Sequence, residues 1–315
     1  MDKKKKQRYK LKNWSNYNQA LINRGSLTLW FEESMIKQWH QPEKTGYRGS
    51  PMTYSDTAIQ CALTLRELFK LPLRATQGCL LSLVQLLKLS IQIPHYSTLS
   101  RRQQTLEVRL PRSSSRTPRH LVVDSTGLKV YGEGEWKVRK HGASKRRTWR
   151  KLHIMVDAQT QEVVAVEMTA NFVGDSEVLP DLLEQLDEHD QVASVAADGA
   201  YDTIQCHQAI RNKGADALIP PREGAVEWPS DEDGRTHPRT AIVQRCAEIG
   251  RKAWKQESGY HQRSLAETAM FRIKTLFSGQ LKNRTFAAQM VEAYLRVGAM
   301  NKMTGLGMPE SYSVS

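Results

Sequence analysis

Three acidic residues stand where folding can bring them together. Asp124 ends the short β-branched run LVVDST, and Asp198 ends the apolar run VASVAAD. An aspartate that closes a strand projects from the carboxyl edge of a sheet, where open α/β sheets place their ligands. Glu267 lies on a predicted late helix that can pack against the same sheet. Each aspartate alone has a simpler interpretation, a residue that starts a turn, so only the group of three indicates a site.

Such a group would need a cation. Three carboxylates packed closely repel one another unless a positive charge joins them. Mg²⁺ and Mn²⁺ are hard ions that prefer oxygen ligands and keep positions open for phosphate. Two such ions can activate water or a 3′-hydroxyl on one side of a phosphodiester and stabilise the departing oxygen on the other. Asp124, Asp198 and Glu267 therefore predict a site for two Mg²⁺ ions, or Mn²⁺ in their place, that acts on nucleic acid.

The segment around Glu267 carries other polar residues at helical spacing. In YHQRSLAETAMFRIK, the residues Tyr260, Arg263, Glu267 and Lys274 follow one another at intervals of three, four and seven. At about 100° per residue, they project within an arc of about 60° on a helix. Arg263 can hold a phosphate through two hydrogen bonds, Lys274 supplies a point charge, and Tyr260 can stack or hydrogen-bond. The alternative is an ordinary helix glutamate with solvated neighbours.

Residues 119–305 have the pattern of an α/β domain. The expected order is three strands, a helix, a strand, a helix, a strand and then the helix of Glu267. Three successive strands suggest a meander, and the later strand-helix-strand order implies a mixed sheet flanked by helices. A polar tail, 306–315, follows. The expected strands are 121–126, 149–160, 162–170, 192–198 and 216–221.

Residues 1–115 are basic and contain helical patterns without reliable strand alternation, so an all-α region is expected there. The segment RSSSRTPRH at 112–120 has the composition of a linker. A helix pair within 73–106 predicts a helix-turn-helix whose short second helix would carry Arg101 and Arg102 into the major groove. A plain helical bundle with a solvated basic face is the alternative.

The charge balance favours a polyanionic partner. Lys and Arg number 46 against 33 Asp and Glu, a formal net charge of +13, which points first to nucleic acid. The longest apolar run, 79–87, is about half a bilayer span, and no signal peptide is visible, so a cytoplasmic protein without membrane partners is expected. The run 137–151 is strongly basic and can neutralise phosphates, although a solvated charged hairpin is the alternative. Its candidate DNA contacts are Lys140, Arg146, Arg147 and Arg150.

The motifs together resemble those of bacterial insertion-sequence transposases of the DDE superfamily. The branch with the signature Y-x2-R-x3-E-x6-K, similar to the insertion-sequence-five group, is matched by Tyr260, Arg263, Glu267 and Lys274. The segments VVDSTGLKVYG and AADGAYD are similar to the family's first and second acidic motifs. The resemblance implies an RNase H-like catalytic domain in which the three acidic residues are the catalytic metal ligands. It also implies that the other three signature residues hold DNA at the cut end.

The resemblance further implies what such a protein does. It would bind the terminal inverted repeats of its own insertion sequence, cleave DNA and transfer the strand to target DNA, as a homodimer on paired ends in the nucleoid of a bacterial cell. A metal-dependent nuclease that does not join DNA and a catalytically inactive DNA-binding relative remain open. The interval from Asp198 to Glu267 has room for one helix, one strand and a modest loop, so the large β-rich insertion of some relatives is expected to be absent.

Overall fold

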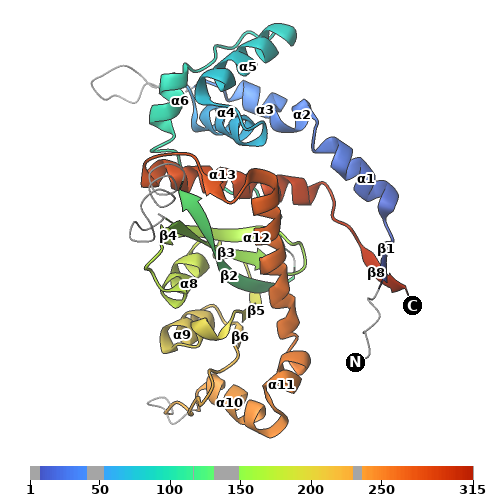
Figure 1. Ribbon diagram of the computed structural model, residues 1–315, viewed down its shortest axis with the longest axis vertical. Coiled ribbons are helices and arrows are strands. Elements are labelled where there is room, and N and C mark those ends of the chain that lie inside the picture. The colour runs from blue at the N-terminus through green and yellow to red at the C-terminus, as the bar shows by residue number, and fades with distance from the viewer. Residues whose placement is uncertain (1–7, 41–52, 116, 131–148, 230–235, 315) are drawn as a thin grey trace, which may run out of the picture. The chain divides into compact units, whose positions relative to one another are not determined.

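The computed structural model describes residues 8–40, 53–115, 117–130, 149–229 and 236–314. The chain forms two compact units, one of Met1–Pro111 with Gly298–Ser315 and one of Arg112–Val297 (Figure 1). The expected linker begins at this division. The expected catalytic domain of 119–305 stays a prediction; the final helix contributes residues to both units.

The first unit is mostly helical. Its helices α4, α5 and α6 pack against one another. It also contains a two-stranded antiparallel ribbon, in which Arg8 pairs with Val314 and Leu11 with Ser311. The prediction of an all-α region and a separate tail omitted this ribbon, because its two strands are too short and too distant in sequence to show a local pattern. The elements are β1 (Arg8–Leu11), α1 (Trp14–Asn23), α2 (Leu27–Trp30), α3 (Glu33–Lys37), α4 (Asp56–Leu68), α5 (Leu73–Leu86), α6 (Tyr96–Arg102) and β8 (Ser311–Val314).

The helix pair α5 and α6 lies where a helix-turn-helix is predicted. The connection runs from Leu87 to His95, which is longer than the three- or four-residue turn usual for that motif. His95 stands at the start of α6, where its ring nitrogen accepts from the Ser97 backbone N–H at 3.4 Å. The helix-turn-helix stays a prediction, with a connection of unusual length.

The second unit is built on a mixed sheet with the order β4-β3-β2-β5-β6, and β7 pairs with the far end of β2. The strands β2, β3 and β4 form an antiparallel meander, while β5 and β6 run parallel to β2. The expected mixed sheet flanked by helices is confirmed. The strands are β2 (Arg119–Val130), β3 (Trp149–Asp157), β4 (Val163–Ala170), β5 (Val192–Ala196), β6 (Asp216–Leu218) and β7 (Gln280–Leu281).

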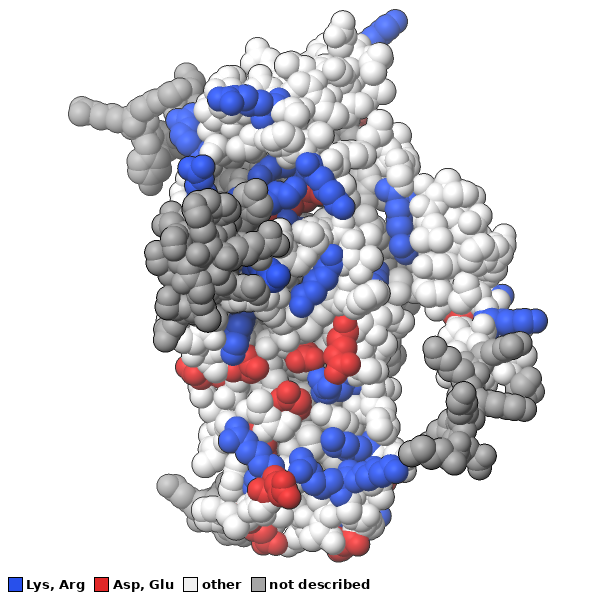
Figure 2. Space-filling view, in the orientation of Figure 1, with Lys and Arg blue, Asp and Glu red and all other residues white. Residues whose placement is uncertain are grey.

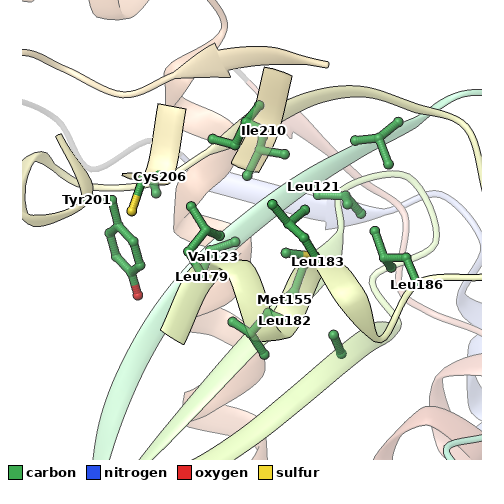
Figure 3. Packing of buried hydrophobic residues seen from close by; sticks show 14 of the residues in the cluster. Leu121, Val123, Met155, Leu179, Leu182, Leu183, Leu186, Tyr201, Cys206 and Ile210 are labelled. Atoms are coloured by element: carbon green, nitrogen blue, oxygen red, sulfur yellow. The ribbon is translucent and has the colours of Figure 1, made fainter. Parts of the chain in front are cut away.

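The two faces of this sheet are covered by different helices (Figure 1). On one face, Leu121, Val123 and Met155 pack under apolar side chains of α8 (Asp175–Glu184) and α9 (Ile204–Asn212), as Figure 3 shows. Side chains alternate along a strand, so Asp124 projects to the opposite face. There α12 contacts both β2 and β3.

The interval between Asp198 and Glu267 holds more structure than expected. Two helices, α10 (Pro238–Ile249) and α11 (Arg251–Glu257), follow β6, and η2, a 3₁₀ turn at Tyr260–Arg263, leads into α12 (Ser264–Phe277). The prediction of one helix, one strand and a loop was therefore wrong in the helix count. The last helix, α13 (Phe286–Gly305), completes the chain's helical elements. In the described ranges, we find no helix with the length and apolar character needed to cross a bilayer.

Candidate active site

Asp124 lies in the interior of β2, not at its end as expected. Its position is nevertheless open on one side. The parallel pairing with β5 ends at Val122 and Ala196, and β7 pairs only from Lys129 onward. Within the described residues, no strand pairs with that side of β2 at Asp124. The carboxylate therefore stands beside the end of β5, as a residue at the carboxyl edge of the sheet would.

Asp198 follows β5 and begins a short 3₁₀ turn. Its Oδ1 accepts a hydrogen bond from the Ala200 backbone N–H at 2.8 Å. The Oδ1 of Asp124 accepts in the same way from the Ser125 N–H at 2.8 Å. Each aspartate thus uses one oxygen to fix its own conformation and leaves the other for a partner.

Arg263 joins two of the three carboxylates. Its Nη1 donates to Asp124 Oδ2 at 2.8 Å, and its Nη2 donates to Glu267 Oε1. Burial raises the pKa of Asp124 above its ordinary value; the Ser125 N–H and Arg263 oppose this rise, and the negative charges of Asp198 and Glu267 add to it. All three predicted acidic residues therefore lie close enough to act on one another.

The chemistry of this group suits a divalent cation. Carboxylate oxygens are the ligands that Mg²⁺ and Mn²⁺ prefer, and the guanidinium of Arg263 shows that Asp124 and Glu267 can share one positive charge. In the part of the chain that the structure describes, no three acidic, histidine or cysteine side chains are arranged closely enough to hold one ion. In this structure the positive charge shared by Asp124 and Glu267 is that of Arg263.

The other two signature residues have partners within the same unit. Lys274 donates from Nζ to Thr126 Oγ1 at 2.6 Å, two positions along β2 from Asp124. Tyr260 is only 8% exposed, and its ring packs against Trp254 with the ring centroids 6.2 Å apart. Burial raises its pKa above the ordinary value. Gly259, at φ 72°, precedes Tyr260. Residues Tyr260–Arg263 form a 3₁₀ turn and not the first turn of the expected α-helix.

Of the other predicted DNA contacts, two are engaged elsewhere. Arg102 donates to the Tyr54 carbonyl at 2.9 Å and pairs with Asp56. Arg150 donates to Gln289 Oε1 at 2.9 Å and lies 5.0 Å from the centre of the Phe286 ring. Arg101 is exposed on α6. Lys140, Arg146 and Arg147 lie outside the described residues.

A buried ion pair next to Asp198 was not expected. Asp202 precedes α9, but Thr203 caps that helix by accepting from the Cys206 N–H at 3.3 Å. The carboxylate of Asp202 instead accepts from Arg239 Nε at 2.6 Å and Nη2 at 2.7 Å, and it lies 3.2 Å from His207 Nε2. Asp202 and Arg239 are 7% and 4% exposed.

The pair of Asp202 and Arg239 joins the turn of Asp198 to the first turn of α10. The guanidinium of Arg239 lies 4.1 Å from the centre of the Trp228 ring. Arg222 donates from Nε to the Gly199 carbonyl at 3.1 Å and from Nη2 to the Ala200 carbonyl at 3.2 Å. The aspartate spacing in DGAYD is a sequence signal for this contact, whereas Arg239 gave none, because its neighbours have the composition of a surface loop.

A second polar cluster lies on the opposite face of the sheet. His153 is fully buried, and its Nε2 lies 2.9 Å from Thr169 Oγ1. Asp175 lies 3.8 Å from His153 Nδ1 and accepts from Lys151 Nζ at 3.0 Å. His153 pairs with Ser125 in the sheet, so its side chain projects away from the face of Asp124. His153 is therefore a buried core residue and not a side chain of the Asp124 face.

Known transposases are similar to this chain in sequence pattern and in fold. Two models of the transposase DDE domain match the chain, one over residues 22–133 and one over residues 115–302. The chain is similar to a piggyBac transposase in a synaptic complex with hairpin DNA, with 12% identity and a TM-score of 0.39 over 90% of this chain and 73% of that one. It is also similar to the Drosophila P element transposase in a strand transfer complex, with 15% identity and a TM-score of 0.30 over 66% and 44%. The second domain model covers more than half of the chain, and the chain therefore belongs to the family of DDE transposases, enzymes that cleave DNA and transfer its strands.

Proposed function

We propose that Asp124, Asp198 and Glu267 are the catalytic residues of this transposase. The observation that supports this assignment is the placement of Arg263, which donates to both Asp124 and Glu267 beside the turn of Asp198. Arg263 and Asp124 are 139 positions apart in the sequence and are joined here by a direct hydrogen bond. A buried structural ion pair needs one carboxylate, whereas a group of three is what metal-dependent phosphodiester chemistry uses.

The same three residues would hold two Mg²⁺ ions, for which Mn²⁺ can substitute. When bound, such ions supply the positive charge that activates the attacking oxygen and stabilises the leaving oxygen. The protein's own contribution is to keep the carboxylates in place. The backbone N–H groups of Ser125 and Ala200 each hold one carboxylate oxygen, of Asp124 and of Asp198, and binding of a cation would require Arg263 to leave Asp124 and Glu267.

The signature residues would then act on DNA. Arg263, displaced from Asp124 and Glu267, keeps a guanidinium that can bind a phosphate through two hydrogen bonds. Lys274, which donates to Thr126 beside Asp124, can add a point charge to the same phosphate group. Tyr260 is largely buried, so we assign it to supporting the DNA-binding surface. This use of the four residues would place the protein in the signature-bearing branch, similar to the insertion-sequence-five group.

The proposed function also includes binding of the DNA ends, dimerisation and two successive attacks on DNA. The helix pair of α5 and α6, with exposed Arg101 on the second helix, would bind the terminal inverted repeats. Two copies would hold paired ends as a homodimer, in the cytoplasm at the nucleoid. Water would attack first, and the freed 3′-hydroxyl would attack target DNA second.

A strand-transfer assay tests this proposal. It combines labelled DNA that carries the end of the element, a supercoiled target, Mg²⁺ or Mn²⁺, and either the parent protein or its Glu267→Gln variant. Joined products from the parent alone are expected. Nicked products without joining would instead indicate a nuclease, and binding without any cut under both metals would indicate an inactive DNA-binding relative.

A further inference from the structure

Helix α11 carries three cations on seven residues, RKAWKQE. Arg251 and Lys252 are exposed and Lys255 is half-buried. Among the described residues, no carboxylate forms an ion pair with any of the three. Arg245 of the preceding helix is different, because it pairs with Glu248 at 3.1 Å and Glu257 at 3.0 Å. The three cations of α11 therefore keep their charge available for an external anion.

The helix is anchored to the start of the proposed catalytic segment. Trp254 is 5% exposed and packs on the ring of Tyr260 at an interplanar angle of 41°. The Nζ of Lys255 lies 4.9 Å from the centre of the same ring. Only Ser258 and Gly259 separate α11 from Tyr260. The cations of α11 are thus held at a fixed place relative to Arg263.

The cations share one side of α11. Arg251 and Lys255 are four residues apart and lie about 40° apart around the helix axis, with Lys252 completing an arc of about 100°. Trp254, the packing residue, lies about 60° from Arg251 in the other direction. Like charges at this spacing destabilise a helix, so the arrangement does not serve the stability of α11.

The surface around α11 also suits a polyanion. Figure 2 shows lysine and arginine side chains gathered over the α10 and α11 region, on the face that presents acidic side chains where α12 begins. From Arg251 to Lys255 the helix rises by about 6 Å, against a rise of about 3.4 Å per phosphate along one DNA strand. Three cations on this length can reach two or three neighbouring phosphates.

We propose that α11 binds the backbone of the duplex DNA that flanks the bond cut by the transposase, with Arg251, Lys252 and Lys255 each neutralising a phosphate. This inference rests on the proposed active site, because that site defines where the DNA is cut. The contact is independent of base sequence, since it is made to phosphates alone.

The test measures DNA binding by fluorescence anisotropy over a range of salt concentrations, without divalent metal. The probe is a fluorescein-labelled duplex that carries the end of the element and its flanking host DNA. The triple variant Arg251→Gln, Lys252→Gln, Lys255→Gln should reduce the slope of log K against log salt by about 2 to 3, because each phosphate contact contributes about 0.9. An unchanged slope in a folded triple variant would overturn the proposal.

Single variants supply the matched control. Lys252→Gln and Arg245→Gln each remove one positive charge from the same helical hairpin, but the charge of Arg245 is already paired. Only Lys252→Gln should lower the slope, by about 0.9. Equal changes of slope in the two variants would show that the salt dependence of DNA binding reflects the net charge of the protein and not contacts made by α11.

Hydroxyl-radical footprinting of the same complexes locates the contact. The triple variant should lose protection only in the DNA next to the cut position, and loss of protection elsewhere would contradict the assignment. The Glu267→Gln variant should bind with the parent's salt slope and still fail to cut. That result separates failure of the active-site assignment from failure of the α11 contact.

Discussion

Arg263 Nη1 lies 2.8 Å from Asp124 Oδ2, so the residue that precedes α12 is paired with the centre of β2. The guanidinium of Arg263 therefore occupies the carboxylate oxygen of Asp124 that a divalent metal would use. In the free enzyme the carboxylates are therefore neutralised in part, which allows them to lie close together before metal and DNA arrive.

Removing the guanidinium should strengthen metal binding while it weakens catalysis. In Arg263→Gln, Asp124 and Glu267 no longer have a competing cation. Both side chains are partly exposed, so the competition is worth roughly 1 kcal/mol, or about fivefold in Mn²⁺ affinity. Electron paramagnetic resonance of free Mn²⁺ measures the affinity without DNA. An unchanged or weaker affinity would show that Arg263 does not compete with the metal.

Asp198→Asn should abolish cutting and joining with little change in fold. The Asn side-chain carbonyl can still accept the hydrogen bond of the Ala200 N–H, which Asp198 accepts at 2.8 Å, so the turn is retained while the charge is lost. We expect a loss of at least about 100-fold in the rate of strand transfer. Circular dichroism and anisotropy with end DNA check fold and binding. Activity close to that of the parent would remove Asp198 from the site.

The buried pair of Asp202 and Arg239 should be a large contributor to stability. Asp202→Asn leaves Arg239 buried without a full charge partner, a change that typically costs about 3–5 kcal/mol. Urea unfolding at pH 7 measures the loss. Asp216→Asn, at an exposed aspartate on β6, is the matched control and should change the free energy of unfolding little.

The Asp202 contribution should also depend on pH. Burial opposes ionisation of this carboxyl, but hydrogen bonds from Arg239 and His207 and the charge of Arg239 outweigh it, so its pKa in the folded protein lies well below the ordinary value. A lowered folded pKa gives stabilisation that is present above about pH 3.9 and is lost as the pH falls through the folded value. The difference in stability between the parent and Asp202→Asn should therefore narrow below about pH 4. A constant difference down to pH 2 would contradict this.

The free energy of unfolding should fall in mild acid because His153 is buried in its neutral form. Burial lowers its pKa to about 4, although Asp175 attracts a proton to it. Because the unfolded chain takes up the proton near pH 6.5, stability is full above that pH and falls by up to about 3 kcal/mol as the pH drops toward 4. Urea unfolding of the metal-free protein at several pH values should show this slope in the parent and lose it in His153→Gln. His189→Gln, at an exposed histidine, should retain it.

Local sequence signals drew attention to the three acidic residues, because Asp124 lies in a recognisable strand, Asp198 follows another strand and Glu267 lies on a periodic helix. The strand signal around Asp124 was sound, but the end of the strand was placed too early. The strand continues to Val130, beyond the expected end at residue 126, because β3 pairs with β2 up to Lys129. The position at which β2 ends depends on its pairing with β3, which cannot be predicted from the residues of β2 alone.

Other features depended on contacts that span the chain. Arg239 looked like a residue of a solvated loop, and its role became visible only when folding brought it to Asp202, 37 positions earlier. The periodic segment that starts at Tyr260 begins as a 3₁₀ turn and becomes α-helical only at Ser264. The spacing of side-chain types does not distinguish these two backbone conformations over a single turn.

The pairing of β1 with β8 has a consequence for the order of synthesis. The first unit needs Gly298–Ser315, which the ribosome makes after every residue of the second unit. Domains usually fold in the order in which they are made. Here all residues of the second unit are synthesised before Gly298–Ser315 of the first unit. The second unit can therefore fold during translation, before β8 is available to pair with β1.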